Sequence, residues 1–345
     1  MSALRFAVIT TTIHVPHVME LHARLRSDAD IIVAGDRKSP HAEIRAIAER
    51  HPNFIYLDVE AQEAMGTKCS EVIGWNSIQR RNLALLQAIS RGADVIVTVD
   101  DDNLPMGPDY IDRLEALFSA PFHGLSGETR PGWFNACSLF DADLYHRGYP
   151  LDKRDGAEEL VLSPVWDAEI GVAAGLWLGD PDIDATTRLV NGPIYRSLSD
   201  VAAAGVVALP ETWTVFNSQN TAYRRELAPL MMVAPGLGRY DDIWGAYIAK
   251  RILRESPWSV HFGPPVVWQQ RNEQNVLVNL EKEIMGMRET PRFIQDLEAF
   301  ALKGSTPFEQ FRNLTADIGK LDYMPRQAVE TWAAFCEDVD RILSA

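Results

Sequence analysis

The sequence predicts an α/β protein with a mainly parallel central sheet flanked by helices. The first 110 residues alternate β-branched runs with amphipathic stretches, which is the pattern of right-handed βαβ units. One run, Val95 to Val99, leads directly into three aspartates, which places these acids at the carboxyl edge of the expected sheet. Beyond Thr290 apolar residues recur at helical spacing, so the chain is expected to end in helices.

The individual elements follow from local patterns. Continuous runs of Val, Ile and Ala are consistent with strands buried on both faces, and helices are expected where apolar residues recur every three or four positions. Asn, Ser and Gly at the ends of such segments act as caps. The expected strands cover residues 6–10, 31–34, 54–57 and 95–99. The expected helices cover residues 17–26, 41–50 and 240–254, and a further one lies within the segment 73–92, between a cap at Asn76 or Ser77 and a cap at Gly92.

Two further regions differ from each other in how regular their patterns are. Residues 121–209 are rich in Trp, Gly, Pro and Asp and show little periodicity, so a long functional loop region is expected there, with order returning at 221–230. In residues 290–345, two sets of apolar residues, around Phe293 and Trp332, have helical spacing. These helices could cap the core or pair two subunits, which leaves a homo-oligomer open.

Composition excludes several classes of protein. The chain has 345 residues and a net charge of -15, which argues against nucleic acid as a partner because phosphate backbones require clustered Lys and Arg. The three cysteines are too dispersed for a disulfide framework or a zinc knuckle. There is no apolar run of roughly 20 residues, no signal peptide pattern, no Gly-x-Gly-x-x-Gly after the first strand and no Walker loop. A soluble cytoplasmic protein without membrane insertion is therefore expected.

Asp100, Asp101 and Asp102 are the most informative residues of the chain. Three adjacent carboxylates repel one another, and Asp is a poor strand residue, so a cation or strong donors must offset the repulsion. Hard oxygen ligands at a strand end suit Mg²⁺ or Mn²⁺, and such an ion could coordinate a diphosphate. The alternative is an acidic turn that caps the next helix.

Other polar residues are expected along the same edge of the sheet. An arginine pair near the start of a helix could bind a diphosphate, although it could also be a solvated helix face or neutralise the acids. Polar residues after the first two strands could contact a base and ribose. The arginine pair is Arg80 and Arg81, and the residues after the strands include Thr10, Thr11, Asp36 and Arg37.

The irregular region carries two further candidates. Residues 147–156 form a loop framed by Gly and Pro that suits a lid over an anion, or is simply a surface turn. Trp177, Asp182 and Asp184 combine an aromatic ring with carboxylates, the side chains that commonly bind a sugar. The alternating acids of this segment also resemble a calcium loop, but the segment lacks the glycine and the final glutamate of an EF-hand, so an EF-hand is rejected.

Asp241 and Asp242 open the helix expected from residue 240. One acid suffices as an N-cap, so the second could contact a sugar or act as a base.

Eight segments together resemble the GT-A glycosyltransferases of the plant reversibly glycosylated polypeptide group, which act as UDP-arabinopyranose mutases, and the related STELLO-type proteins. The resemblance implies a GT-A fold over residues 1–285 followed by a helical extension over residues 286–345. It implies binding of a UDP-sugar with Mn²⁺ or Mg²⁺. The segments are residues 10–13, 35–38, 73–82, 99–103, 147–150, 175–185, 238–244 and 278–280.

The resemblance also implies roles for individual residues. Asp101 and Asp102 are the expected metal ligands, with Asp100 and Asn217 among the residues that contact the substrate. Arg154 matches an arginine tied to reversible glycosylation in the mutases, and it is the expected catalytic residue together with the two acids at 241 and 242.

Three hypotheses about function remain open on the sequence. The first is a metal-dependent enzyme that interconverts the pyranose and furanose forms of a nucleotide sugar, most readily a UDP-sugar. The second is a glycosyltransferase that moves the sugar to a separate acceptor, and the third is a non-catalytic scaffold that binds a nucleotide sugar. The intact acid triplet argues against the scaffold, which does not need a metal site.

Overall fold

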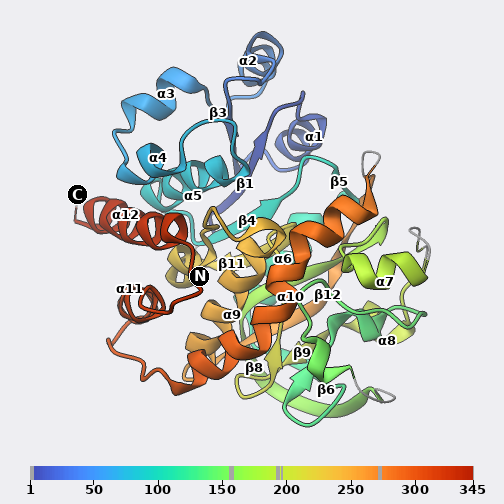
Figure 1. Ribbon diagram of the computed structural model, residues 1–345. Helices are drawn as coiled ribbons and strands as arrows, with labels where there is room; N and C mark the ends of the chain where they lie inside the picture. The colour runs from blue at the N-terminus through green and yellow to red at the C-terminus, as the bar shows by residue number, and fades with distance from the viewer. Residues whose placement is uncertain (1–3, 155–158, 192–194, 196, 271–273, 345) are drawn as a thin grey trace.

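A large β-sheet organises the computed structural model, which describes residues 4–154, 159–191, 195, 197–270 and 274–344 (Figure 1). Residues 155 and 156, the end of the predicted lid loop, lie outside the described residues. Within the described ranges the sheet has ten strands. In their order across the sheet they are β3 (Phe54–Leu57), β2 (Asp30–Gly35), β1 (Phe6–Thr12), β4 (Val95–Val99), β11 (Asn220–Arg224), β8 (Val161–Gly179), β6 (Phe122–Glu128), β9 (Val206–Ala208), β12 (Trp258–Gln269) and β5 (Asn103–Pro105).

The first four strands of this order run parallel, as the sequence predicts. Val8 of β1 lies between Ile31 of β2 and Val97 of β4, and all three side chains are fully buried. Continuous apolar runs suit such strands because helices cover both faces of a parallel sheet. The helices of this half are α1 (His17–Leu25), α2 (His41–Arg50), α3 (Val59–Ala64), α4 (Lys68–Ile73) and α5 (Arg81–Ser90), with the short η1 (Ile78–Arg80) before α5.

The other half of the sheet mixes parallel and antiparallel pairs. β11 runs antiparallel to both β4 and β8, whereas β8 and β12 run parallel. A second, two-stranded sheet pairs β7 with β10. The remaining elements here are α6 (Tyr110–Ser119), β7 (Trp133–Phe134), η2 (Ala136–Leu139), η3 (Leu151–Lys153), α7 (Ala185–Val190), α8 (Asp200–Ala204), β10 (Trp213–Thr214), η4 (Arg225–Met231) and η5 (Gly238–Tyr240).

The prediction of a long loop region over residues 121–209 is wrong in one important respect. β8 lies inside it and is 19 residues long, and its second half from Ile170 is almost entirely buried in the sheet. That half reads Ile-Gly-Val-Ala-Ala-Gly-Leu-Trp-Leu-Gly, and Gly and Ala are poor strand formers. The strand forms because neighbouring strands on both sides pair with it, so tertiary pairing overrides local propensity.

The C-terminal helices pack against the rest of the described chain, and the pairing of two subunits through them stays a prediction. They are α9 (Asp241–Leu253), α10 (Val276–Ala299), α11 (Pro307–Ile318) and α12 (Arg326–Leu343). α10 crosses the front of the sheet, and α12 lies beside α4 and α5 (Figure 1). α10 continues across the predicted domain boundary at residues 285 and 286. Among the described residues, no helix combines the length and the apolar character that a membrane span requires.

A buried carboxylate fastens α12 to the N-terminal half. Asp338, which is 2% exposed, accepts hydrogen bonds from the backbone N–H groups of Lys68 and Cys69 at 3.0 and 2.8 Å. These amides open α4, whose own N-cap residue Thr67 makes no capping bond. The carboxylate therefore caps α4 from a distant part of the chain, and Arg341 donates a further hydrogen bond to it at 3.1 Å.

Replacement of Asp338 should show how much this cap stabilises the fold. Asp338→Ala leaves two amides of α4 without their acceptor, so we expect the free energy of unfolding in urea to fall by roughly 1–3 kcal/mol. Glu337→Gln is the matched control, because Glu337 is the neighbour of Asp338 on α12 and makes an exposed ion pair with Lys68 of α4. Its effect should stay below about 1 kcal/mol. Equal effects of the two substitutions would contradict the capping role.

Candidate functional site

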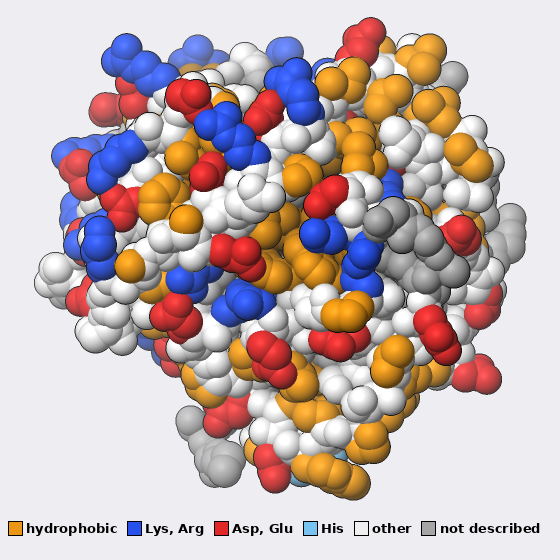
Figure 2. Space-filling view, turned by 60° about the horizontal axis from the view of Figure 1, so that its bottom comes forward, with side chains coloured by type: hydrophobic (Ala, Val, Ile, Leu, Met, Phe, Trp, Pro, Cys, Tyr) orange, Lys and Arg blue, Asp and Glu red, His pale blue; other side chains and the backbone are white. Residues whose placement is uncertain are grey.

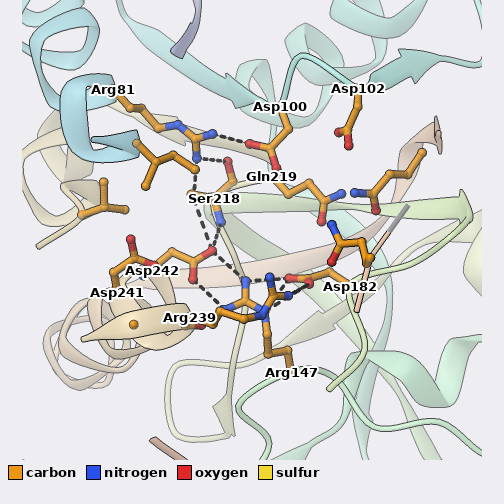
Figure 3. Close-up of a pocket in the computed structure, with 15 residues that line it drawn as sticks. Arg81, Asp100, Asp102, Arg147, Asp182, Ser218, Gln219, Arg239, Asp241 and Asp242 are labelled. Carbon is orange, nitrogen blue, oxygen red and sulfur yellow. Dashed lines mark hydrogen bonds and ion pairs between the residues drawn. The ribbon is translucent and has the colours of Figure 1, made fainter. Parts of the chain in front are cut away.

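Two adjoining cavities open at the carboxyl edge of β1, β2 and β4. The β1 cavity, lined by Thr11, Thr12, Asp36 and Asp101 among others, has a volume of about 310 Å³, and the acidic cavity beside it about 300 Å³. Ile78 lines both, so the two are neighbours. The charged residues that line the acidic cavity are Arg81, Asp100, Asp102, Arg147, Asp182, Arg239, Asp241 and Asp242 (Figure 3).

The three consecutive aspartates after β4 point in different directions. Asp100 forms an ion pair with Arg81, and Asp101 accepts a hydrogen bond from the hydroxyl of Thr12. Asp102 lines the acidic cavity, whereas Asp101 lines the β1 cavity. The divergence relieves the repulsion between the carboxylates and gives each cavity at least one of them.

The residues just before β11 hold the turn of the acid triplet from the other side. The backbone N–H of Asp100 donates to the carbonyl of Gln219 at 2.9 Å, and the Gln219 amide donates to Asn103 Oδ1 at 3.2 Å. Arg81 donates to the hydroxyl of Ser218 at 2.7 Å and to its carbonyl at 3.1 Å. The segment before β11 therefore forms one wall of the acidic cavity.

A buried arginine between two carboxylates forms the floor of the acidic cavity. Arg147 donates to Asp182 Oδ2 from Nη2 at 2.7 Å and to Asp242 Oδ1 from Nη1 at 3.0 Å. Burial opposes the charge of this guanidinium, but the two carboxylates outweigh burial and hold the pKa of Arg147 well above its usual value. Asn217 also donates to Asp182 Oδ2, at 2.8 Å, so this predicted residue orients a carboxylate of the site.

Asp241 and Asp242 differ in acidity although they are neighbours. Burial, and then the charge of Asp242, raise the pKa of Asp241 to about 6, and Gln79 donates a hydrogen bond to its carboxylate at 2.7 Å. Burial also opposes ionisation of Asp242, but the charge of Arg147 outweighs it and lowers the pKa of Asp242. Two acids with pKa values pushed apart are suited to general acid and base roles.

The three arginines of the acidic cavity differ in how fully the protein uses them. Arg81 and Arg147 direct both terminal nitrogens at protein acceptors. Arg239 donates from Nε to Glu283 at 2.8 Å, and its Nη2 lies 3.6 Å from Asp182. Its Nη1 makes no hydrogen bond or ion pair with any residue in the described ranges.

The structure does not bring Arg80 into either cavity, which corrects its expected role as a substrate contact. Its side chain is fully buried and donates to Gln62 Oε1 at 2.7 and 2.9 Å and to Ser70 Oγ at 2.9 Å. The guanidinium also stacks on Trp75, 3.8 Å from the ring centroid. Arg80 therefore holds α3 and α4 against η1, and its neighbour at position 81 faces the cavity.

Three residues of the predicted sugar site and lid also lie away from the two cavities. Trp177 is 2% exposed and stacks on Phe140, with 6.3 Å between ring centroids, so it is a core residue. Asp184 is the N-cap of α7, where it accepts from the Thr187 backbone N–H at 2.8 Å. Arg154 forms an ion pair with Asp184 at 2.7 Å, so the structure holds it beside this cap.

Of the residues predicted to contact the base and ribose, some line the β1 cavity and others do not. Asp36 lines the β1 cavity, but its two oxygens accept from the backbone N–H groups of Asn76 and Ser77 at 2.8 and 3.0 Å. It therefore also fixes the loop that enters η1. Thr10 is fully buried within β1, and Arg37 is exposed and does not line either cavity.

The acidic cavity also has residues that were not predicted as site residues, among them Ser218, Gln219 and Arg239, and it includes Arg147, which the sequence placed only in the predicted lid loop. Ser218 and Gln219 carry no local signal, because only the pairing of β11 with β4 brings them to the acids. Arg147 and Arg239 each adjoin a glycine in segments that the resemblance covers, and this was the available signal.

Comparison with protein families provides the deciding observation. The sequence model described as "Reversibly glycosylated polypeptide" matches residues 6–310, which covers most of the chain and all of the residues that line the two cavities. The chain belongs to the reversibly glycosylated polypeptide family.

Individual relatives agree with the family over a shorter stretch. The UDP-arabinopyranose mutase 3 of Arabidopsis thaliana is 34% identical over 204 residues, covering 56% of this chain and 51% of the relative. The probable UDP-arabinopyranose mutase 2 of Solanum tuberosum is 35% identical over 208 residues, covering 56% and 50%. The chain spans about half the length of the curated relatives it matches. A solved structure named "Crystal Structure of a Mycobacterial Protein" aligns at 11% identity and a TM-score of 0.44 over 88% of this chain and 81% of its own.

The donor atoms at the acid triplet of this family member are suited to a hard cation bound together with a substrate. Within the described ranges, no three His, Cys, Asp or Glu side chains converge to form a metal site from protein ligands alone. Asp102 shares the acidic cavity with the side chains of Gln219 and Gln269, which are further oxygen donors. Mg²⁺ is commonly held by one or two carboxylates and completed by water and substrate phosphates.

The raised pKa of Asp241 predicts how stability depends on pH. The folded protein binds the Asp241 proton more tightly than the unfolded chain does. The contribution of Asp241 to the free energy of unfolding is therefore fully present below about pH 4 and is lost as pH rises through about 6. In Asp241→Asn this pH-dependent loss is absent. The free energy of unfolding of the variant relative to wild type should therefore rise by about 1 kcal/mol between pH 5.5 and pH 8.

Chemical denaturation at the two pH values measures this difference. Asp322→Asn serves as the control, because the Asp322 side chain is 80% exposed and lies outside both cavities. A relative stability of Asp241→Asn that does not change with pH would refute the raised pKa.

Proposed function

We propose that this chain is a metal-dependent enzyme that interconverts the pyranose and furanose forms of a UDP-sugar. The observation that carries the proposal is the acidic cavity, where an acid triplet at a strand end faces a pair of aspartates with separated pKa values. The names of the relatives support the reaction class and the nucleotide. A GT-A type of nucleotide-binding fold is part of the proposal.

The charge of the acidic cavity supports a divalent ion. Among the described residues that line it, five aspartates face three arginines, so an anionic diphosphate would meet a net negative site. Mg²⁺ or Mn²⁺ would neutralise this excess of negative charge, with Asp102 as the protein ligand in the acidic cavity and Asp101 as the second candidate from the β1 side. When bound, the ion would stabilise negative charge on the UDP diphosphate while the bond from the anomeric carbon to the phosphate oxygen is broken, and this bond forms again with the same UDP after the ring has changed.

The nucleoside is assigned to the β1 cavity. Thr11, Asp36 and Lys38 line it and could contact ribose hydroxyls, and Ile13 and Ile78 provide apolar surface for a base. Figure 2 shows one face of the molecule with a hollow in which apolar side chains are visible and at whose rim both basic and acidic side chains lie.

Asp241 is the proposed proton donor and acceptor. Converting a pyranose into a furanose breaks the bond from the anomeric carbon to the ring oxygen and forms a bond from that carbon to another hydroxyl oxygen. The first oxygen gains a proton and the second loses one, so a single group that exchanges protons near neutral pH can serve both steps. A carboxylate with a pKa of about 6 meets this need better than one with the usual value.

Arg154 retains its proposed role in reversible glycosylation, with a condition that the structure adds. Its guanidinium is paired with Asp184 at 2.7 Å and donates to the Tyr149 carbonyl at 2.7 Å. Arg154 Nη2 makes both contacts, so a sugar could reach this nitrogen only after the ion pair with Asp184 opens.

Product analysis tests the proposal directly. The protein is incubated with UDP-arabinopyranose and MnCl₂, and the nucleotide sugars are separated by chromatography. A UDP-furanose product without any acceptor is the expected result. UDP release that requires an added acceptor would support a transferase instead, and metal-dependent binding without any turnover would support a scaffold.

Calorimetry with UDP tests the metal site. Asp102→Asn removes the proposed ligand of the acidic cavity, so we expect affinity for UDP in MnCl₂ to fall at least tenfold, to the level that wild type shows in EDTA. Asp101→Asn should have a smaller effect, because this side chain faces the β1 cavity and bonds to Thr12. Asp322→Asn should bind UDP as wild type does. Unchanged affinity of Asp102→Asn would exclude this residue as a metal ligand.

A further inference from the structure

The guanidinium of Arg239 is held on two sides and open on a third. Nε donates to Glu283 Oε1 at 2.8 Å, and Nη2 lies 3.6 Å from Asp182 Oδ1. Nη1 has no partner within the described part of the chain, although the residue lines the acidic cavity and its side chain is 24% exposed. Arginines bind phosphate and carboxylate groups through such unused N–H groups. Among the described arginines that line the acidic cavity, Arg239 is therefore the one with a terminal nitrogen available for a ligand.

Glu283 fixes Arg239 from outside the cavity. It is 1% exposed, and its second oxygen, Oε2, accepts from the backbone N–H of Ala185 at 2.8 Å. Ala185 is the first residue of α7, so one carboxylate of α10 ties η5 to α7. Glu283 does not line the acidic cavity and can act on a ligand there only through Arg239.

Two glycines allow α10 to lie close enough for this contact. Gly238 has φ +61°, and a Cβ at this position would lie 2.9 Å from the Lys282 carbonyl oxygen. A Cβ at Gly286 would lie 2.1 Å from the ring of Tyr240. Lys282 precedes Glu283 in the sequence, and Tyr240 follows Arg239. The close approach of the two segments at both glycines therefore places the Glu283 carboxylate against the Arg239 guanidinium.

We propose that Arg239 binds an oxyanion of the sugar-linked phosphate and that Glu283 is its positioning residue. This inference rests on the proposed function, because it assumes a nucleoside diphosphate in the acidic cavity. In Figure 3, Arg239 lies across the cavity from Asp102. A diphosphate between them would have the metal site on one side and Arg239 on the other. Without Glu283, Asp182 is the one remaining described partner of the Arg239 guanidinium, so the orientation of Nη1 is lost.

The test compares UDP with UMP, which lacks the second phosphate. Calorimetric titrations in MnCl₂ use wild type, Glu283→Gln, Arg239→Gln and the double variant. Each single substitution should weaken UDP binding by roughly tenfold or more, because a charge-assisted hydrogen bond is lost or misdirected. UMP binding should stay within about twofold. The double variant should bind UDP no more weakly than Arg239→Gln alone, because Glu283 acts through Arg239.

Glu281→Gln is the matched control, since Glu281 is exposed on the same helix. The inference is overturned if wild type binds UDP and UMP equally, if Glu283→Gln leaves UDP affinity unchanged, or if the effects of the two substitutions add. Should Glu283→Gln not fold, the UDP and UMP titrations of Arg239→Gln decide alone, and equal losses for both ligands overturn it. Absence of any UDP binding to wild type would overturn the proposed function as well, which separates that failure from the others.

Discussion

The placement of Arg147 between Asp182 and Asp242 is the constraint on which the site depends. Burying one cation and two anions is costly unless each is paired with good geometry, so the three side chains fix one another. They come from the loop before η3, the segment before α7 and the start of α9. Asp242 also accepts from the Ser218 backbone N–H at 3.1 Å, and Ser218 in turn holds Arg81. A continuous chain of hydrogen bonds and ion pairs thus crosses the cavity from Asp182 to Asp100 of the acid triplet.

The same network makes the two neighbouring aspartates of α9 chemically different. Asp242 gains the charge of Arg147, whereas Asp241 feels burial and the charge of Asp242. Proximity to one arginine therefore separates two residues of identical type. An excess of carboxylates over guanidinium groups gives the cavity its negative balance, which is the physical basis for expecting a divalent ion with any diphosphate.

Two helices near the C-terminus, α10 and α12, are fastened to earlier parts of the chain by buried carboxylates. Asp338 of α12 caps α4, and Glu283 of α10 holds Arg239 at the cavity wall. Both are buried carboxylates that satisfy backbone or guanidinium donors far away in the sequence. A helical amphipathic pattern predicts that such helices exist, but the partner of an individual buried acid depends on how the helices pack.

The sequence by itself determined the parallel strands β1 to β4, the helices α1, α2 and α5, the acid triplet at a strand end and membership of the family, but not the short helices α3 and α4. The features that it determined follow from local periodicity and from motifs, which are properties of short segments. Only the tertiary structure decided that Arg81 and not Arg80 faces the cavity, because adjacent residues of a helix point about 100° apart. It also placed Trp177 in the core, formed β8 from a Gly- and Ala-rich segment, and joined Arg147 and Arg239 to the acids. Those outcomes depend on strand pairing and on the packing of residues that are distant along the chain.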